Sequence, residues 1–186
     1  MAGGTDTQLL LLRGVNVGGH NRVPMADLRA LLAGLDCEEV ATYLQSGNAV
    51  CRSARAPDDL ATAVGEALTS ELGVTVPVVA RSRVQWAATV AGNPLVDLTD
   101  DPKLLHVVFL DGPPEADRAG ALESEAEGFA PERLAVVGPD VYLHTPAGYH
   151  QTRLTNTLLE RRLGRVATAR NWRTVLALAD LAGVDV

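Results

Sequence analysis

The chain is poor in several residue types, and each shortage excludes a class of protein. Its 186 residues include two cysteines, Cys37 and Cys51, which form no C-x-x-C pair and have no His/Cys spacing typical of a zinc site. So few thiols exclude a disulfide scaffold and fit a reducing compartment. We therefore interpret both cysteines as buried free thiols and expect a cytoplasmic protein.

Long apolar runs, positive charge and aromatic residues are also scarce. No apolar run approaches the roughly 20 residues that a membrane-spanning helix needs, and residues 1–7 lack the pattern of a secretion signal. The formal net charge of -7 repels phosphate backbones. Residues 8–13 and 49–52, the strands on which an RNA-recognition module would stack bases, contain no aromatic side chain. We expect neither a membrane nor a nucleic acid as a partner.

The hydrophobic residues, 47% of the chain, are arranged in a pattern that predicts the same order of elements twice. Each half reads β-α-β-β-α-β followed by a helix, which is the order of a ferredoxin-like unit, or α-β plait. We predict an α+β fold of two such units, residues 1–95 and 96–186, each with an extra helix at its end. They should pack closely because the linker is short. The predicted strands are 8–13, 40–44, 49–52, 74–80, 104–110, 134–137, 141–144 and 166–169, and the predicted helices are those beginning near Pro24 and Asp58, then 83–91, 115–127, 154–163 and 171–182.

The first of three polar clusters, residues 13–19, follows directly after the first predicted strand. Glycines allow backbone N–H groups to approach an anion closely, and the planar guanidinium of Arg13 suits phosphate or carboxylate. Asn16 adds a donor and an acceptor. The cluster matches neither common nucleotide-binding motif. The alternative is a structural loop, in which glycines serve a turn, Asn16 adopts a left-handed conformation and Arg13 pairs with an acid.

The other two clusters have similar alternatives. Ser46 and Asn48 offer hydroxyl and amide groups to a ligand, or they belong to an ordinary hairpin turn. Arg170 and Asn171 lie at a predicted helix start, which attracts anions. Alternatively, Asn171 caps that helix. For Trp172 we favour a place in the core at the start of an apolar helix face.

At these clusters the chain resembles a bacterial family called domain of unknown function 1697. The resemblance covers nearly the whole chain and implies two intertwined α-β plaits, but it implies no activity. The family usually carries lysine after the Gly-Gly pair, where this chain has His20, so a fixed positive charge there would be replaced by a titratable one. The matching segments are residues 11–19, 23–29, 42–48 and 168–175.

Together these features predict a cytoplasmic binding protein or enzyme that recognises a small anionic ligand, provided that the clusters meet in space. No catalytic residue, cofactor or metal site is predicted, because no histidine has a close metal-binding partner and Ser46 lacks a nucleophile motif. A non-catalytic interaction module, with Arg13 and Arg170 buried and bonded to backbone or acids, is the alternative; nucleic-acid binding is less favoured. The predicted ligand-binding residues are Arg13, Asn16, Gly18, Gly19, His20, Ser46, Asn48, Arg170 and Asn171.

Overall fold

The computed structural model describes residues 5–185, which divide into two compact units. The first unit falls within Met1–Ala88 and Leu178–Val186, and the second is Thr89–Ala177. The end of the chain thus belongs with its beginning, and each unit is described by itself below.

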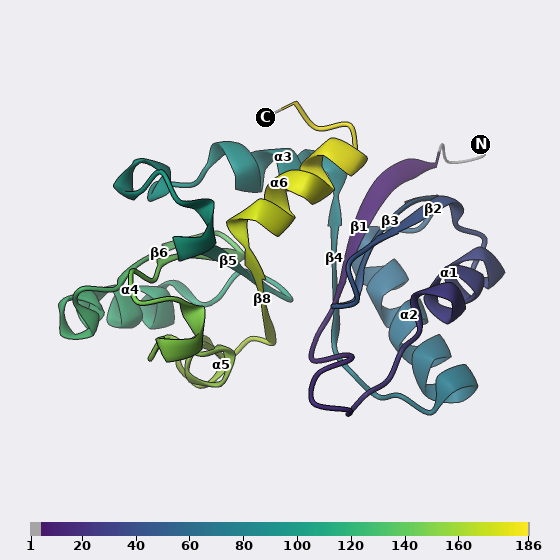
Figure 1. Cartoon of the computed structure of the whole chain (residues 1–186), viewed down its shortest axis with the longest axis horizontal. Coiled ribbons are helices and arrows are strands. Elements are labelled where there is room, and N and C mark those ends of the chain that lie inside the picture. The colour runs from purple at the N-terminus through teal and green to yellow at the C-terminus, as the bar shows by residue number, and fades with distance from the viewer. Residues whose placement is uncertain (1–4, 186) are drawn as a thin grey trace. The chain divides into compact units, whose positions relative to one another are not determined.

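The first unit is built on a four-stranded antiparallel sheet in the order β2-β3-β1-β4. Helices α1 and α2 connect the strands and cover one face (Figure 1). This is the β-α-β-β-α-β plait that the periodicity predicts. Its elements are β1 (Asp6–Leu12), α1 (Met25–Gly34), β2 (Glu38–Tyr43), β3 (Asn48–Ser53), α2 (Pro57–Leu72) and β4 (Val78–Ser82), with α3 (Arg83–Ala91) after them.

The second unit repeats this plan, with strand order β6-β7-β5-β8. The predicted α+β fold of two ferredoxin-like units is confirmed. The elements are β5 (Leu105–Leu110), α4 (Ala116–Ser124), β6 (Arg133–Val137), β7 (Asp140–His144), α5 (Asn156–Leu163) and β8 (Ala167–Asn171), with short 3-10 turns at Val96–Leu98, Pro102–Leu104, Ala126–Phe129 and Tyr149–Gln151. The last helix, α6 (Trp172–Leu181), begins in the second unit and ends in the first.

One strand is displaced from its predicted position. Residues 74–80 are predicted as a strand, but β4 begins at Val78 and continues to Ser82. Val74 and Val76 are buried in the core, so they are apolar because they pack there and not because they belong to a strand of the sheet. Pro77 has no N–H to donate, and its carbonyl accepts from the N–H of Arg13 at 3.0 Å, which places it at the border of the sheet.

The central strand of each sheet is buried on both faces. Leu10 and Leu12 of β1 pack in the core under α1 and α2, while Leu9 and Leu11, which point to the opposite face, are also at most 1% exposed. This double burial explains why β1 reads as a continuous apolar run and not as an alternation. In the second unit β5 is buried along its whole length in the same way.

The duplication extends to individual hydrogen bonds. Arg81 at the end of β4 and Arg170 at the end of β8 are both buried. Each donates from Nη1 to the carbonyl of the residue before it, Ala80 at 3.0 Å and Ala169 at 2.8 Å. The arginine before each final helix therefore occupies an equivalent place in the two units.

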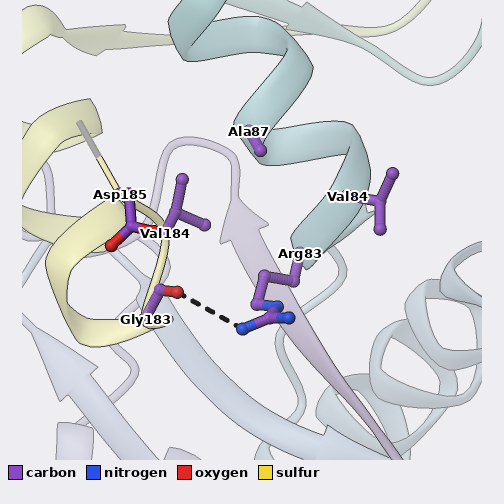
Figure 2. A pocket seen from close by; sticks show the side chains of 6 residues that line it. All are labelled: Arg83, Val84, Ala87, Gly183, Val184 and Asp185. Atoms are coloured by element: carbon purple, nitrogen blue, oxygen red, sulfur yellow. Dashed lines mark hydrogen bonds between the residues drawn. The ribbon is translucent and has the colours of Figure 1, made fainter.

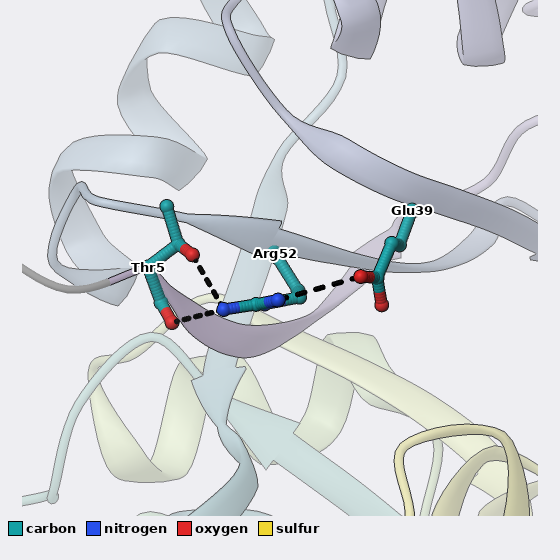
Figure 3. A network of polar contacts seen from close by, with 3 residues as sticks. All are labelled: Thr5, Glu39 and Arg52. Carbon is teal, nitrogen blue, oxygen red and sulfur yellow. Dashed lines mark hydrogen bonds and ion pairs between the residues drawn. The ribbon is translucent and has the colours of Figure 1, made fainter.

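The outer edge of the first sheet is held by Arg52 of β3. Its guanidinium donates to the hydroxyl of Thr5 at 2.8 Å and to the Glu39 carboxylate at 3.3 Å (Figure 3). Glu39 lies in an irregularity of the β2–β3 pairing and has a positive φ of 50°. Arg52 thus ties the irregular strand to the start of β1.

Gly47 marks the closest approach between the β2–β3 turn and the end of β1. Its φ is 77°, and a Cβ there would lie 2.6 Å from Cγ2 of Val15 and 2.7 Å from Cβ of Leu12. Gly73, at the end of α2, has a similar φ of 66° but open space around it. Substitutions at these two glycines therefore distinguish the cost of left-handed backbone, which both share, from the cost of a steric clash, which only Gly47 has.

We expect Gly47→Ala to lower the free energy of unfolding by about 1–3 kcal/mol more than Gly73→Ala. Both variants place a side chain on left-handed backbone, and only the first forces two buried neighbours to move. Urea unfolding of both variants measures the difference. Equal losses would show that the turn adjusts freely.

Candidate functional site

The segment of residues 13–23, called the 13–23 loop below, forms a small hairpin. The N–H of Asn16 donates to the carbonyl of Asn21 at 3.1 Å, and that of His20 donates to the carbonyl of Val17 at 3.0 Å. Gly18 and Gly19 have φ values of 58° and 81°, as the two central residues of a type I′ turn require. The turn therefore explains why glycine occupies both positions.

Asn16 holds this hairpin against the β2–β3 turn. Its φ is 56°, the left-handed conformation that asparagine tolerates. The side-chain amide donates to the carbonyls of Val23 at 2.8 Å and Gln45 at 2.7 Å, and its oxygen accepts from the N–H of Val23 at 2.9 Å. Both amide hydrogens are thus engaged, and the structure brings the first two polar clusters together.

The second cluster is organised by Asn48, which is fully buried. Its amide donates to the carbonyl of Tyr43 and to the hydroxyl of Ser46, both at 2.9 Å. Gly47 accepts from the N–H of Leu12 at 2.8 Å, which joins the turn to the end of β1. Ser46 itself is exposed, as are Leu44 and Gln45 before it, so a ligand can reach this part of the turn.

Three cationic or titratable side chains belong to the 13–23 loop. Arg13 is half-buried and engaged in interactions, whereas His20 and Arg22 are exposed. Within residues 5–185, no hydrogen bond or ion pair involves the side chain of His20 or Arg22. Sequence reasoning missed Arg22; the signal that could have found it is that residues 7–26 contain no acid.

The third cluster lies in the second unit. Arg170 is buried and donates to the hydroxyl of Thr168 at 2.8 Å, and burial lowers the pKa of its guanidinium to about 10. Asn171 accepts from the N–H of Arg173 at 3.0 Å, so it caps α6, and its amide donates to the carbonyl of Lys103 at 3.0 Å. Trp172 is buried, as expected.

A buried histidine lies beside Asn171. His106 is 6% exposed, and its ring stacks on that of Tyr149 with centroids 4.4 Å apart. Nε2 lies 3.3 Å from the amide nitrogen of Asn171, which makes Nε2 the acceptor. Within residues 5–185, the buried Nδ1 finds no hydrogen-bond partner. Burial lowers the pKa of His106 to about 4, so the ring is neutral at pH 7.

Three surface pockets lie elsewhere, and none of the three is lined by a predicted ligand-binding residue. Figure 2 shows one of them, beside Arg83, whose Nη1 donates to the carbonyl of Gly183 at 3.3 Å. Because Asp185 offsets the charge of Arg83 there, this pocket favours no charged ligand. The second pocket runs along α2 and is rich in hydroxyl groups, and the third, beside Phe129, contains both Glu132 and Arg153.

Between residues 5 and 185, no group of three His, Cys, Asp or Glu side chains is placed to hold a metal ion. Over the same range, no helix is long and apolar enough to cross a membrane. The two cysteines are free and buried, as expected.

Comparison with known proteins identifies the family. The model of the family described as a protein of unknown function (DUF1697) matches residues 6–142, so the chain belongs to that family. Its structure is similar to that of the conserved bacterial protein SP0830 from Streptococcus pneumoniae, with 24% identity and a TM-score of 0.76 over 96% of this chain and 99% of that one. This likeness supports the fold. No curated protein matched.

We expect Asn16→Asp to destabilise the first unit by about 2–3 kcal/mol, because it removes two donors and sets a carboxylate against two carbonyl oxygens. Asn21→Asp is the control, since the amide of Asn21 makes one bond, to the carbonyl of Gly14 at 3.1 Å, and should cost about 1 kcal/mol. Urea unfolding compares the two. Equal values would mean that Asn16 does not hold the loop.

The neutral His106 makes stability depend on pH. Because the unfolded chain takes up a proton near pH 6.5 and the folded state only near 4, stability present above pH 6.5 is lost as the pH falls toward 4. Between pH 7 and 5 this group should remove about 2 kcal/mol. His106→Gln keeps an acceptor but does not titrate, so its unfolding free energy should fall by correspondingly less. If the unfolding free energies of the parent and His106→Gln fell equally between pH 7 and 5, His106 would not be the group responsible.

Proposed function

We propose that the first unit binds a small anionic ligand at the surface formed by the 13–23 loop and the β2–β3 turn. The observation that carries this proposal is the length of the connection between β1 and α1. The second unit supplies an internal reference, because it makes the same connection in the same fold.

The connection between β1 and α1 takes twelve residues, 13–24, whereas that between β5 and α4 takes five, 111–115. Both begin alike: the N–H of Arg13 donates to the carbonyl of Pro77, and that of Asp111 donates to the carbonyl of Val166. A plait therefore needs no hairpin at this place. Extra loop residues held in a defined conformation on a scaffold are where binding sites concentrate.

The charge around this surface favours an anion. Residues 7–26 and 40–57 contain no Asp or Glu, although the chain has 23 acids. The two segments are the ones that Asn16 and Gly47 join. On a protein of net charge -7, these two adjoining stretches without an acid carry Arg13, His20 and Arg22, and they favour negative groups.

The arginines of this region differ in their contacts and exposure. Arg52 is bonded to Thr5 and Glu39, and Arg55 donates to the carbonyl of Leu35 at the end of α1. Arg22 and His20 are exposed on the hairpin, and Arg13 lies at its base. We assign exposed Arg22, with Arg13 at the base of the hairpin and His20 beside it, to attract the anion.

Backbone donors add to these side chains. Within residues 5–185, the N–H groups of Gly18 and Gly19 donate to no protein acceptor. These groups suit a compact oxyanion such as phosphate or a carboxylate. Asn16 and Asn48 hold the surface in shape, and Arg170 and Asn171 stay candidates in the second unit.

Calorimetric titration with inorganic phosphate, pyrophosphate and acetate, at low ionic strength, tests this proposal. We expect saturable binding of at least one anion, weakened about tenfold in Arg22→Ala because a charged hydrogen-bond donor is lost. Arg161→Ala is the matched control, since it removes an exposed arginine of the second unit and changes the net charge equally. Saturation should also raise the melting temperature, by mass action.

His20→Lys supplies a second variant at the same surface. Lysine carries a fixed positive charge with three N–H donors, so this variant should bind the anion severalfold more tightly than the parent at pH 8. Binding that is equal in the parent, Arg22→Ala and Arg161→Ala, or absent for all three anions, would reject the proposed function.

A further inference from the structure

Two exposed aliphatic side chains flank the candidate anion site. Val17, in the hairpin of the 13–23 loop, is 64% exposed, and Leu44, directly after β2, is 56% exposed. The hydrogen bond from the amide of Asn16 to the carbonyl of Gln45, 2.7 Å long, joins the residues next to them in sequence. This bond thus brings together the two segments that carry the exposed Val17 and Leu44, and His20 and Arg22 lie on the first of them.

Leu44 is also held in an unfavourable backbone conformation. Its φ is 57°, the left-handed region that L-residues with large side chains rarely adopt. Other non-glycine residues with positive φ in the described chain include Asn16, Asn21 and Asp36, whose short polar side chains suit it. An exposed leucine at such a position adds nothing to the core, and asparagine would fit the backbone better. Strain of this kind is typical of functional positions.

Resting on the proposed function, we infer that the ligand is an amphipathic anion: a phosphate or carboxylate head that carries an alkyl or similarly apolar group. The head lies against Arg22, His20 and the hairpin N–H groups, and the apolar group covers Val17 and Leu44. Two side chains form too small an apolar surface for a stable protein partner, which buries roughly 800 Å² on each side. They suffice for a short chain of methylene groups.

Calorimetric titration with inorganic phosphate and hexyl phosphate, and with acetate and hexanoate, tests this inference. Each methylene group that is buried should raise the affinity roughly fourfold. We expect the hexyl compound of the favoured head group to bind at least about tenfold more tightly than its short counterpart.

Leu44→Asn and Val17→Thr should each reduce this gain while leaving the affinity for the short anion unchanged. Leu44→Asn should not lower the melting temperature, because asparagine suits the left-handed backbone, so a loss of binding cannot be ascribed to unfolding. Val137→Thr, which changes an exposed valine of the second unit, is the matched control and should keep the full gain.

Sedimentation with vesicles of neutral lipid, with and without 30% anionic lipid, distinguishes the two sources of such a ligand. Retention on the anionic vesicles that Leu44→Asn abolishes would identify a lipid head group, and binding of hexyl phosphate or hexanoate alone would identify a free metabolite. Short anions that bind as tightly as the hexyl compounds, or a gain that both variants retain, would overturn the inference while the proposed function stands. Failure of every anion would overturn both.

Discussion

The first unit depends on the burial of β1 between two neighbouring strands and under both faces of its sheet. Leu9 to Leu12 are almost wholly buried, so the strand has no polar face that would by itself fix its register. The ends fix it instead: the N–H of Leu12 is bound by Gly47, and the next, that of Arg13, by Pro77 on the other side. The chain therefore leaves the sheet at a defined point and in a defined direction, and the 13–23 loop begins there.

From that point the loop is shaped by one side chain. Asn16 satisfies two carbonyls and one N–H with a single amide group, and one of the carbonyls belongs to the β2–β3 turn. Because the amide of Asn16 is bonded both to Val23 within the loop and to Gln45 in the β2–β3 turn, it ties the hairpin to the sheet. A ligand bound at this hairpin, as we propose, would therefore meet a preorganised surface, which reduces the entropy lost on binding. His20 and Arg22 are exposed on this hairpin.

Because the plait occurs twice in the chain, the second unit shows which features of the first unit the plait itself requires. The second unit has the same strand order and an equivalent buried arginine, yet it joins its first strand and helix with five residues and places Asp111 where the first unit has Arg13. What the two units share is explained by the plait. What only the first unit has is the hairpin and the neighbouring stretches without an acid, and the proposed function rests on this difference.

The sequence by itself determined the order of elements, because the period of apolar residues is a local property that each helix and strand displays separately. It also predicted, as one of two alternatives, a turn at the glycines and left-handed backbone at Asn16, since turn chemistry is local too. Only the tertiary structure decided that Val74 and Val76 pack without joining a ladder, that Arg52 pairs with Glu39 while Arg22 stays exposed, and that the amide of Asn16 reaches Gln45. The reason is that a hydrogen bond or a buried contact depends on a partner brought near by folding. No pattern within a short window of the chain specifies that partner.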